Sequence, residues 1–238
     1  IILCAGIGSR LNSEKPKGFI KIRKKTLLEI CVRNFLLKGI KKKNIFFGTG
    51  YKQEMIKKKF GKNFNYCFNK KFKTTNMVYT LFSALKKIKT SDIIISYSDI
   101  IYNKSNIDKL LKDKNDISTL IDFNWKKMWK KKKKLFTDSE SLKIKNNKII
   151  ELGKPTNQIK KIDGRYVGVI KISKKKLPMI KKLYNKFLKK KPKKFENIDM
   201  TNFLNFLIKR KFEIYPIKLN GNWNEYDDFV DLNYKNEN

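Results

Sequence analysis

Short apolar runs alternate with amphipathic segments in the first half of the chain, and this alternation constrains the fold more than any other feature. The apolar runs occupy residues 1–5, 44–49, 65–68 and 92–98, and helical periodicity occurs over 26–38, 53–60 and 76–87. The run at 92–98 (DIIISYS) is apolar at consecutive positions, which is typical of a strand buried on both faces of a parallel sheet. The pattern therefore predicts βαβ units with right-handed crossovers, and an α/β fold with a mostly parallel central sheet.

The second half of the chain continues with strands and helices in a less regular order. Strands are predicted over 117–123, 166–172 and 212–218, a hairpin over 141–152, and helices over 175–188, 200–209 and 228–233. A lysine-rich insert occupies about 124–137, and its run 126–134 is predicted to be a solvated loop or helix face. No linker or repeat divides the chain, so we expect one domain over residues 1–238.

The charge balance is strongly basic, with 58 Lys and Arg against 21 Asp and Glu and a net charge of +37. Only five of the basic residues are Arg, and lysine is spread along the whole chain together with Asn and Ile, all three encoded by A/T-rich codons. A protein that binds nucleic acid usually clusters its basic residues and uses Arg for bidentate contacts. We therefore do not expect nucleic acid as a partner, and keep a basic nucleic-acid-binding module as the alternative from another class.

Several kinds of chemistry are excluded by what the chain lacks. It contains no histidine, which rules out Ser-His-Asp and Cys-His catalysis and zinc sites built on histidine. Cys4, Cys31 and Cys67 show no CxxC spacing, so we expect neither disulfides nor a thiolate zinc site, and a reducing cytoplasm as the location. No run of 18 apolar residues occurs, so we expect no membrane span.

The loop after the first predicted strand carries the clearest sign of a ligand. Gly6 and Gly8 can bring backbone N–H groups close to phosphate oxygens. Leu11 stands where a dinucleotide fingerprint needs its third glycine, and the Walker A pattern is absent. Arg10 and Lys17 add two cations to the same loop. Glycine donors combined with two fixed cations predict a site for a triphosphate.

Two carboxylates are candidates for binding a metal ion. Asp99 ends the apolar strand 92–98, and ligands bind beyond the carboxyl ends of strands in parallel sheets. A carboxylate in this place suits Mg²⁺, which combines a few protein oxygens with substrate phosphates. Asp227, in the segment WNEYDD, could be a second ligand, while Asp228 could cap the last helix. A turn at the strand end and helix capping are the structural alternatives for these residues.

Four segments together resemble the nucleotidyltransferases that make sugar nucleotides and CDP-activated headgroups. They are ILCAGIGSRL followed by KPK, GTGYK at 48–52, the strand ending in SDI, and WNEYDDFVDL at 223–232. The family's motifs are approximately LAAGxGxRL…PK, a strand ending in Asp, and EIDxxxDL. Cys4 and Tyr226 depart from these patterns. The resemblance implies a Rossmann-like, three-layer nucleotidyltransferase fold.

Within that family the chain is most similar to the phosphocholine, phosphonate and phosphoglutamine cytidylyltransferases. The similar segments are FNKKF (68–72), TNMVYTL (75–81), DFNW (122–125), ELGK (151–154), GRYVGVIKIS (164–173) and DMT (199–201). This similarity implies CTP-dependent transfer of CMP to phosphoglutamine, 2-aminoethylphosphonate or phosphocholine, with release of pyrophosphate, for the decoration of surface polysaccharide or lipid. A sugar-1-phosphate nucleotidyltransferase that uses UTP or dTTP is the alternative enzyme.

The resemblance also assigns roles to individual residues. Lys17, Arg10 and Lys154 would be catalytic, with Lys154 near the α-phosphate or the acceptor phosphate. Asp99 and Asp227 would bind Mg²⁺. CTP would be held by Leu3, Ala5, Gly6, Gly8, Gly50, Tyr51, Thr75, Asn76 and Ser98.

The acceptor would bind to a part of the chain from about residue 117 to 220. There the resemblance implies contacts with Asp122, Trp125 and Tyr166. Asp122 could pair with a primary amine or simply cap the lysine-rich insert. Trp125 could join Trp129, Tyr79 and Tyr97 around a choline group, although aromatic side chains in such a chain usually belong to the core. The sequence leaves a monomer and a homodimer both open.

Overall fold

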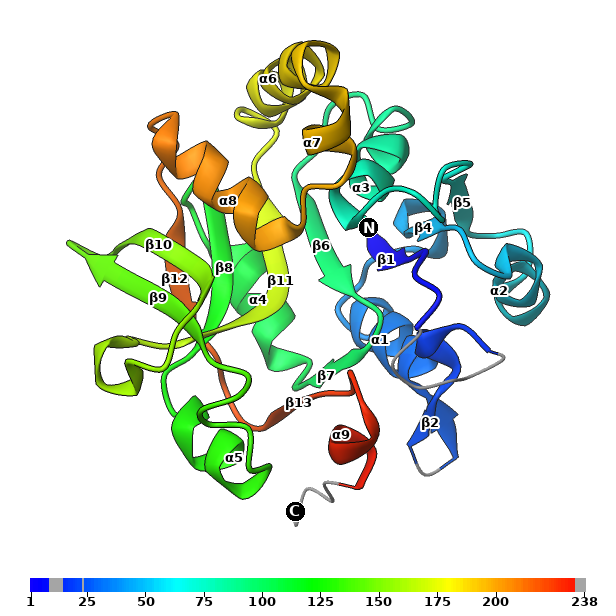
Figure 1. Ribbon diagram of the computed structural model, residues 1–238. Coiled ribbons are helices and arrows are strands. Elements are labelled where there is room, and N and C mark those ends of the chain that lie inside the picture. Colours follow the sequence, from blue (N-terminus) through cyan, green and yellow to red (C-terminus); the bar gives the residue numbers. More distant parts are fainter. Residues whose placement is uncertain (9–14, 23, 234–238) are drawn as a thin grey trace.

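The computed structural model describes residues 1–8, 15–22 and 24–233 (Figure 1). Seven strands form the central sheet in the order β12-β8-β11-β6-β1-β4-β5. Strand β11 is antiparallel to β6 and β8, whereas the other neighbouring pairs are parallel. The prediction of an α/β fold with a mostly parallel sheet is confirmed. The strands are β1 (Ile2–Cys4), β4 (Phe46–Thr49), β5 (Asn65–Phe68), β6 (Ile93–Tyr97), β8 (Ile117–Asp122), β11 (Arg165–Ile172) and β12 (Tyr215–Lys218).

The register of the sheet brings three loops to one edge. Leu3 of β1 pairs with Gly48 of β4 on one side and with Tyr97 of β6 on the other. Because these strands are parallel, their carboxyl ends lie next to one another. The segments that follow β1, β4 and β6 therefore emerge at the same edge, where open α/β sheets bind their ligands.

Helices cover the sheet with their apolar sides. Helix α3 packs on β1, β4 and β5 and buries Val78, Leu81 and Leu85, while α4 packs on β8. In Figure 1, α2 and β5 lie at the right of the sheet, and α5 and the β9–β10 hairpin lie at the left. The helices are α1 (Leu27–Leu36), α2 (Gln53–Phe60), α3 (Met77–Leu85), α4 (Ser105–Lys112), α5 (Trp125–Lys131), α6 (Leu177–Lys190), α7 (Pro192–Glu196), α8 (Met200–Lys209) and α9 (Phe229–Asn233), with the short 3-10 helices η2 (Lys17–Phe19), η3 (Lys42–Asn44) and η4 (Ile159–Lys161).

Within the described ranges, three small antiparallel ribbons complete the fold. The predicted hairpin is confirmed as β9 (Glu140–Lys145) and β10 (Lys148–Pro155), joined by Asn146 and Asn147 at positive φ of 50° and 55°, as a type I′ turn requires. A second ribbon pairs β2 (Lys21–Ile22) with β3 (Lys25–Thr26). The third pairs β7 (Ile100–Tyr102) with β13 (Trp223–Glu225), which was not predicted. This last ribbon joins parts of the chain more than 120 residues apart, and it begins directly after Asp99.

The lysine-rich insert corrects one sequence-based prediction. Part of it forms α5, and Lys126, Lys127, Lys130 and Lys133 are exposed as predicted. The prediction of a solvated run is wrong for Lys132 and Lys134, which are only 3% and 8% exposed. Both form ion pairs with aspartates in the segment that contains α9.

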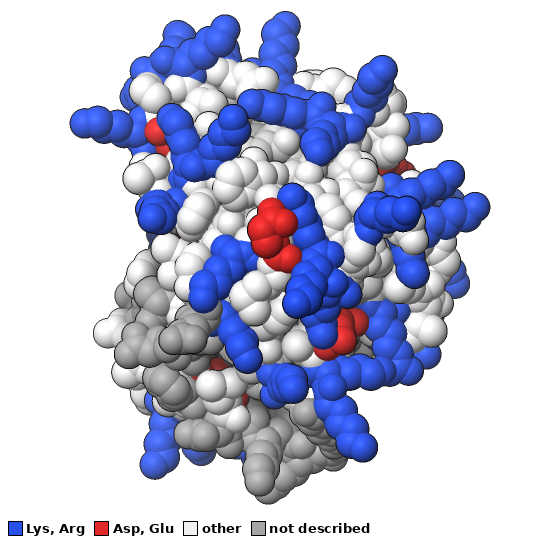
Figure 2. Space-filling model, turned by 90° about the vertical axis from the view of Figure 1, so that its right-hand side faces the viewer, with Lys and Arg blue, Asp and Glu red and all other residues white. Residues whose placement is uncertain are grey.

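Elsewhere the lysines lie on the surface. Figure 2 shows Lys and Arg side chains spread over much of the face that carries α2 and β5, and not gathered into one groove. This spread favours genome composition as the origin of the high charge. None of the helices in the described ranges is long and apolar enough to cross a membrane.

The N-terminus of α1 carries a capping box that makes the stability of the fold depend on pH. The Thr26 side chain accepts a hydrogen bond from Glu29 N, and the Glu29 carboxylate accepts one from Thr26 N at 2.7 Å. Lys59 Nζ lies 2.8 Å from Glu29 Oε1. Burial acts to raise the pKa of Glu29, but the hydrogen bonds from Lys59 and Thr26 outweigh it and lower this pKa from 4.5 to about 2.

We expect Glu29→Gln to reduce the free energy of unfolding by about 1 kcal/mol at pH 7. A carboxyl whose pKa is lowered by folding stabilises the fold above its unfolded pKa, and this contribution is lost as the pH falls toward the folded pKa. The difference between the two proteins should therefore shrink between pH 4.5 and pH 2. Urea unfolding at pH 7 and pH 3 measures it, and an equal difference at both pH values would contradict the assignment.

Candidate active site

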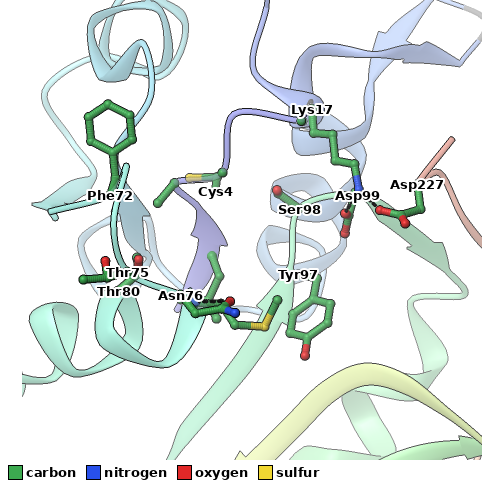
Figure 3. A pocket seen from close by; sticks show the side chains of 16 residues that line it. Cys4, Lys17, Phe72, Thr75, Asn76, Thr80, Tyr97, Ser98, Asp99 and Asp227 are labelled. Atoms are coloured by element: carbon green, nitrogen blue, oxygen red, sulfur yellow. Dashed lines mark hydrogen bonds and ion pairs between the residues drawn. The ribbon is translucent and has the colours of Figure 1, made fainter. Parts of the chain in front are cut away.

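A pocket of about 400 Å³ opens at the carboxyl ends of β1 and β6 (Figure 3). One part of its lining comes from the loop that follows β1, a second from the end of β6, and a third from the turn before α3. Ten of the predicted site residues line it, namely Leu3, Ala5, Gly6, Gly8, Lys17, Thr75, Asn76, Ser98, Asp99 and Asp227. The structure therefore brings together residues that are far apart in the sequence but were predicted to share one site.

Lys17 lies between the two carboxylates that were predicted to bind a metal ion. Its Nζ is 2.9 Å from Oδ2 of Asp99 and also forms an ion pair with Oδ1 of Asp227. Figure 3 shows the lysine reaching from one wall of the pocket toward both aspartates. The three side chains are mostly buried, with exposed fractions of 17%, 20% and 24%. Two carboxylates thus converge on one cation in a partly desolvated position, where charge interactions are stronger than in water.

The β7–β13 ribbon is what brings the two aspartates together. Asp99 directly precedes β7, and Asp227 follows two residues after the end of β13. Tyr226 N donates a hydrogen bond of 2.9 Å to Asp99 O, which joins the two segments at the position of the carboxylates. The proximity of the two carboxylates that were predicted to bind a metal ion therefore depends on a pairing between short strands that lie far apart in the sequence.

This donor set fits a magnesium ion. Two carboxylates that face a common point supply the hard oxygen ligands that Mg²⁺ prefers, and substrate phosphates and water usually complete its coordination. No group of three or more His, Cys, Asp or Glu that could hold a metal occurs within residues 1–8, 15–22 and 24–233. The protein alone would thus offer two ligands from these ranges, and the remaining ligands would come from substrate and water.

The loop after β1 packs closely against Lys17. Gly8 has a φ of +72°, and a Cβ at this position would lie 3.1 Å from Cγ of Lys17. A glycine therefore satisfies the left-handed backbone and leaves room for the lysine stem. Arg10, which was predicted to act together with Lys17, lies outside the described residues, and its role stays a prediction.

The opposite wall of the pocket is formed by the turn that leads into α3. Asn76 caps this helix, and its Oδ1 accepts a hydrogen bond from Met77 N at 2.7 Å. The buried Asn69 holds the turn, because its Nδ2 donates to Oγ1 of Thr75 and of Thr80 at 2.9 and 3.0 Å. Its Oδ1 accepts from Lys71 N. This bonding gives a physical reason for the family-like segments FNKKF and TNMVYTL.

Gly50 and Tyr51 support the pocket from behind and do not line it. Tyr51 N donates a hydrogen bond of 3.1 Å to Ala5 O. A Cβ at Gly50 would lie 2.5 Å from Cβ of Phe72 and 2.8 Å from Ala5 O. Gly50 therefore allows the end of β4 to pack between two residues that face the ligand space.

Two tyrosines lie at the β6 end of the pocket. Tyr97 lines it, whereas Tyr166, which was predicted to contact the acceptor, does not belong to the lining and reaches the pocket only through its hydroxyl, which donates a hydrogen bond of 3.2 Å to the Tyr97 hydroxyl. Burial raises the pKa of both phenols above the usual value near 10. Both hydroxyls therefore stay protonated and neutral over the physiological pH range.

The structure does not bring three other predicted residues into the pocket. The Asp122 carboxylate accepts hydrogen bonds from Trp223 Nε1 and Asn124 N, both at 2.8 Å, and so serves the fold. The prediction that Trp125 contacts a ligand is wrong, because this side chain is 1% exposed and packs edge-on against the equally buried Trp129. Lys154 projects from β10 outside the pocket, where its Nζ lies 2.7 Å from Glu151 Oε2.

Sequence reasoning also missed part of the lining. The lining residues that were not predicted as nucleotide-binding are Gly18, Phe72, Met77, Thr80 and Tyr97. No sequence pattern marks Phe72 as a lining residue, because the direction of its side chain is set by the turn that Asn69 holds.

The fold and this pocket place the chain among proteins that bind a nucleotide at the carboxyl edge of an open α/β sheet. Residues 1–123, about half of the chain, match the family described as the MobA-like NTP transferase domain. The chain belongs to this family, and it is a nucleotidyltransferase. The predictions of the fold class and of the enzyme class are confirmed.

One relative that matches over nearly its whole length is a cytidylyltransferase, and two solved structures share the fold. The CTP:phosphoglutamine cytidylyltransferase of Campylobacter jejuni is 34% identical over 246 residues, which cover 98% of this chain and 96% of that protein. The inositol-1-phosphate CTP transferase from T. maritima has the same fold, with a TM-score of 0.72, 19% identity, and coverage of 98% of this chain and 90% of that one. The CTP:phosphocholine cytidylyltransferase from Streptococcus pneumoniae also has this fold, with a TM-score of 0.73 and 20% identity. That match covers 97% of this chain and 94% of the other.

Proposed function

We propose that the protein transfers CMP from CTP to a small acceptor that carries a phosphate, phosphonate or phosphoramidate group, and releases pyrophosphate. The observation that carries this proposal is the convergence of Lys17, Asp99 and Asp227 beside the glycine loop. The full-length similarity to the Campylobacter jejuni enzyme supports CTP as the nucleotide and phosphoglutamine as the first acceptor to test. The product would be an activated headgroup for surface polysaccharide or lipid, made in the cytoplasm, where CTP is available.

In this proposal the two walls of the pocket divide the nucleotide between them. Backbone N–H groups of the loop at Gly6 and Gly8 would face the phosphates, with Lys17 and Arg10 as cations. Thr75 and Asn76, on the opposite wall, would contact the base and ribose. Leu3, Ala5 and Ser98 would form the floor between the two walls, and Gly50 and Tyr51 would support it from behind.

The chemistry needs no general base. An anionic oxygen of the acceptor attacks the α-phosphorus of CTP, and a new P–O bond forms. The bond from the α-phosphorus to the oxygen that bridges to the β-phosphorus breaks, and its electron pair leaves with pyrophosphate. Because the acceptor oxygen is already an anion at neutral pH, a chain without histidine can carry out the step. The barrier lies in bringing two anions together in line.

The residues of the pocket would lower that barrier by positioning the two anions and by stabilising their charge. Lys17 would hold phosphate oxygens and stabilise the charge that develops on them. Asp99 and Asp227 would hold Mg²⁺, which when bound supplies Lewis-acid charge stabilisation. Lys154 could meet a phosphate only after its Nζ leaves the ion pair with Glu151. Tyr97, with a protonated hydroxyl, would offer a hydrogen bond to the acceptor, and Tyr166 would hold that hydroxyl in place.

An acceptor panel tests the proposal. Pyrophosphate release with CTP and Mg²⁺ is measured for phosphoglutamine, 2-aminoethylphosphonate, phosphocholine and glucose-1-phosphate. We expect turnover with one of the first three and none with glucose-1-phosphate. Preferred turnover of glucose-1-phosphate would instead place the enzyme with the sugar-1-phosphate nucleotidyltransferases.

The packing of Gly50 gives a separate prediction for the nucleotide wall. A Cβ at this position overlaps Phe72 and Ala5, so Gly50→Ala must displace the loop after β1 or the turn before α3. We expect a loss of about 1–3 kcal/mol in stability and weaker CTP binding. Thermal unfolding and the KM for CTP measure both effects. Gly39→Ala is the control: a Cβ there meets no atom within 4 Å, and its φ of +79° makes the substitution strain the backbone outside the pocket lining, so it separates a loss of stability from an effect on the pocket. Equal effects of the two substitutions on KM would contradict the assignment.

A further inference from the structure

The five consecutive lysines at 130–134 do not share one environment. Lys130 and Lys133 are exposed, whereas Lys132 and Lys134 point into the protein. The backbone causes this difference: α5 ends at Lys131, Lys133 adopts a left-handed φ of 58°, and Lys134 N donates a hydrogen bond to Trp129 O at 2.9 Å. The turn directs alternate side chains of the run toward the C-terminal segment.

The two buried lysines bind one buried aspartate. Lys132 Nζ lies 2.8 Å from Oδ1 of Asp231, and Lys134 Nζ lies 2.8 Å from its Oδ2. Lys134 Nζ is also 2.7 Å from Oδ2 of Asp228. Lys132 additionally lies over the Trp129 ring, with 5.0 Å between Nζ and the ring centroid. A buried charge that loses its partner is strongly destabilising, so these pairs hold the segment in one arrangement.

Asp231 connects this cluster with the active site. Its Oδ2, the oxygen bound to Lys134, accepts a hydrogen bond from Asp227 N at 2.9 Å. The side chain of Asp227 then extends to Lys17, opposite Asp99. Helix α9, only five residues long, is too short to be stable alone, so the direction of the Asp227 backbone depends on such tertiary contacts.

We propose that Lys132 and Lys134 are positioning residues that set the Asp227 carboxylate for metal binding, acting through Asp231. This inference rests on the proposed function in taking Asp227 as a ligand of Mg²⁺. It assigns a specific role to two positions of a low-complexity run whose neighbours Lys130 and Lys133 only face solvent. Because contacts outside the coordination sphere tune metal affinity, loss of either lysine should weaken metal activation more than it affects the CTP site.

The test uses Lys134→Gln and Lys132→Gln, with Lys130→Gln as the matched control from the same run. Glutamine keeps a donor but removes the charge. We expect the magnesium concentration for half-maximal activity to rise about tenfold in the first two variants, with little change in KM for CTP at saturating Mg²⁺. Lys134→Arg should restore most of the magnesium response. Circular dichroism establishes that each variant is folded.

A second readout does not depend on activity. Deuterium exchange of the peptide that contains Asp227 and Asp228 should be faster in Lys134→Gln than in the wild type, and unchanged in Lys130→Gln. Active lysine variants with an unchanged magnesium response would overturn the inference. Failure of the proposed function would give a different result, because the wild type itself would then release no pyrophosphate from CTP. In that case unchanged exchange in the lysine variants would still overturn the positioning role.

Discussion

Lys17→Met is expected to lower kcat by about 10²–10³. The Lys17 ammonium is the cation in the described part of the site that contacts both predicted metal ligands, and it lies beside the glycine loop. Methionine keeps the part of the side chain that packs against Gly8 and lacks only the terminal ammonium group. The substitution therefore tests charge stabilisation with little change in shape.

The measurement is steady-state pyrophosphate release with CTP and the best acceptor, and Lys21→Met, an exposed lysine of the β2–β3 ribbon, is the control. The same variant should bind Mn²⁺ more tightly than the wild type in the absence of CTP, because the carboxylates of Asp99 and Asp227 lose their competing cation. Near-wild-type kcat in Lys17→Met would remove Lys17 from the mechanism.

Asp99→Asn should reduce kcat/KM by about 10³, which corresponds to about 4 kcal/mol of transition-state stabilisation. Asparagine keeps the shape of the side chain but is neutral. The two carboxylates that would hold a divalent ion are thereby reduced to one. Asp227→Asn should act in the same direction, because the two aspartates face the same point. The loss should shrink as the magnesium concentration rises, since the defect is in metal affinity.

Asp108→Asn provides the matched control for this substitution. Asp108 lies on α4, pairs with Lys38 and does not belong to the pocket lining. A Mg²⁺ titration of kcat/KM compares the three variants with the wild type. If the magnesium dependence of Asp99→Asn were unaltered, Asp99 would not be a metal ligand. It would then serve only the turn at the end of its strand.

The parts of the fold that local patterns encode could be predicted from the sequence. The consecutive apolar residues of β6 and the periodicity of α2 and α8 mark elements whose character is set within a few neighbouring residues. The glycine loop was readable for the same reason, because Gly6, Gly8 and Lys17 are close in sequence. Parallel strands then bring these loops to one edge without further information.

Features made by distant pairing could not be predicted in this way. Strands β7 and β13 are three residues each, and the sequence pattern of neither strand indicates that it pairs with the other. The burial of Lys132 and Lys134 depends on Asp228 and Asp231, about 100 residues later. Trp125 failed as a ligand contact because its burial is decided by packing against Trp129, which composition does not reveal.

Selection of CTP by this pocket and transfer of its CMP group can be tested directly. The most direct measurement is to incubate the enzyme with Mg²⁺, the best acceptor and each of CTP, UTP, ATP, GTP and dTTP, following pyrophosphate release and the mass of the product. We expect a product whose mass equals that of the acceptor plus CMP minus one water molecule. It should form with CTP, and the other nucleotides should react at least 100-fold more slowly, which corresponds to about 2.7 kcal/mol. Equal or faster turnover of UTP or dTTP would contradict this expectation, as would the absence of pyrophosphate release with every nucleotide.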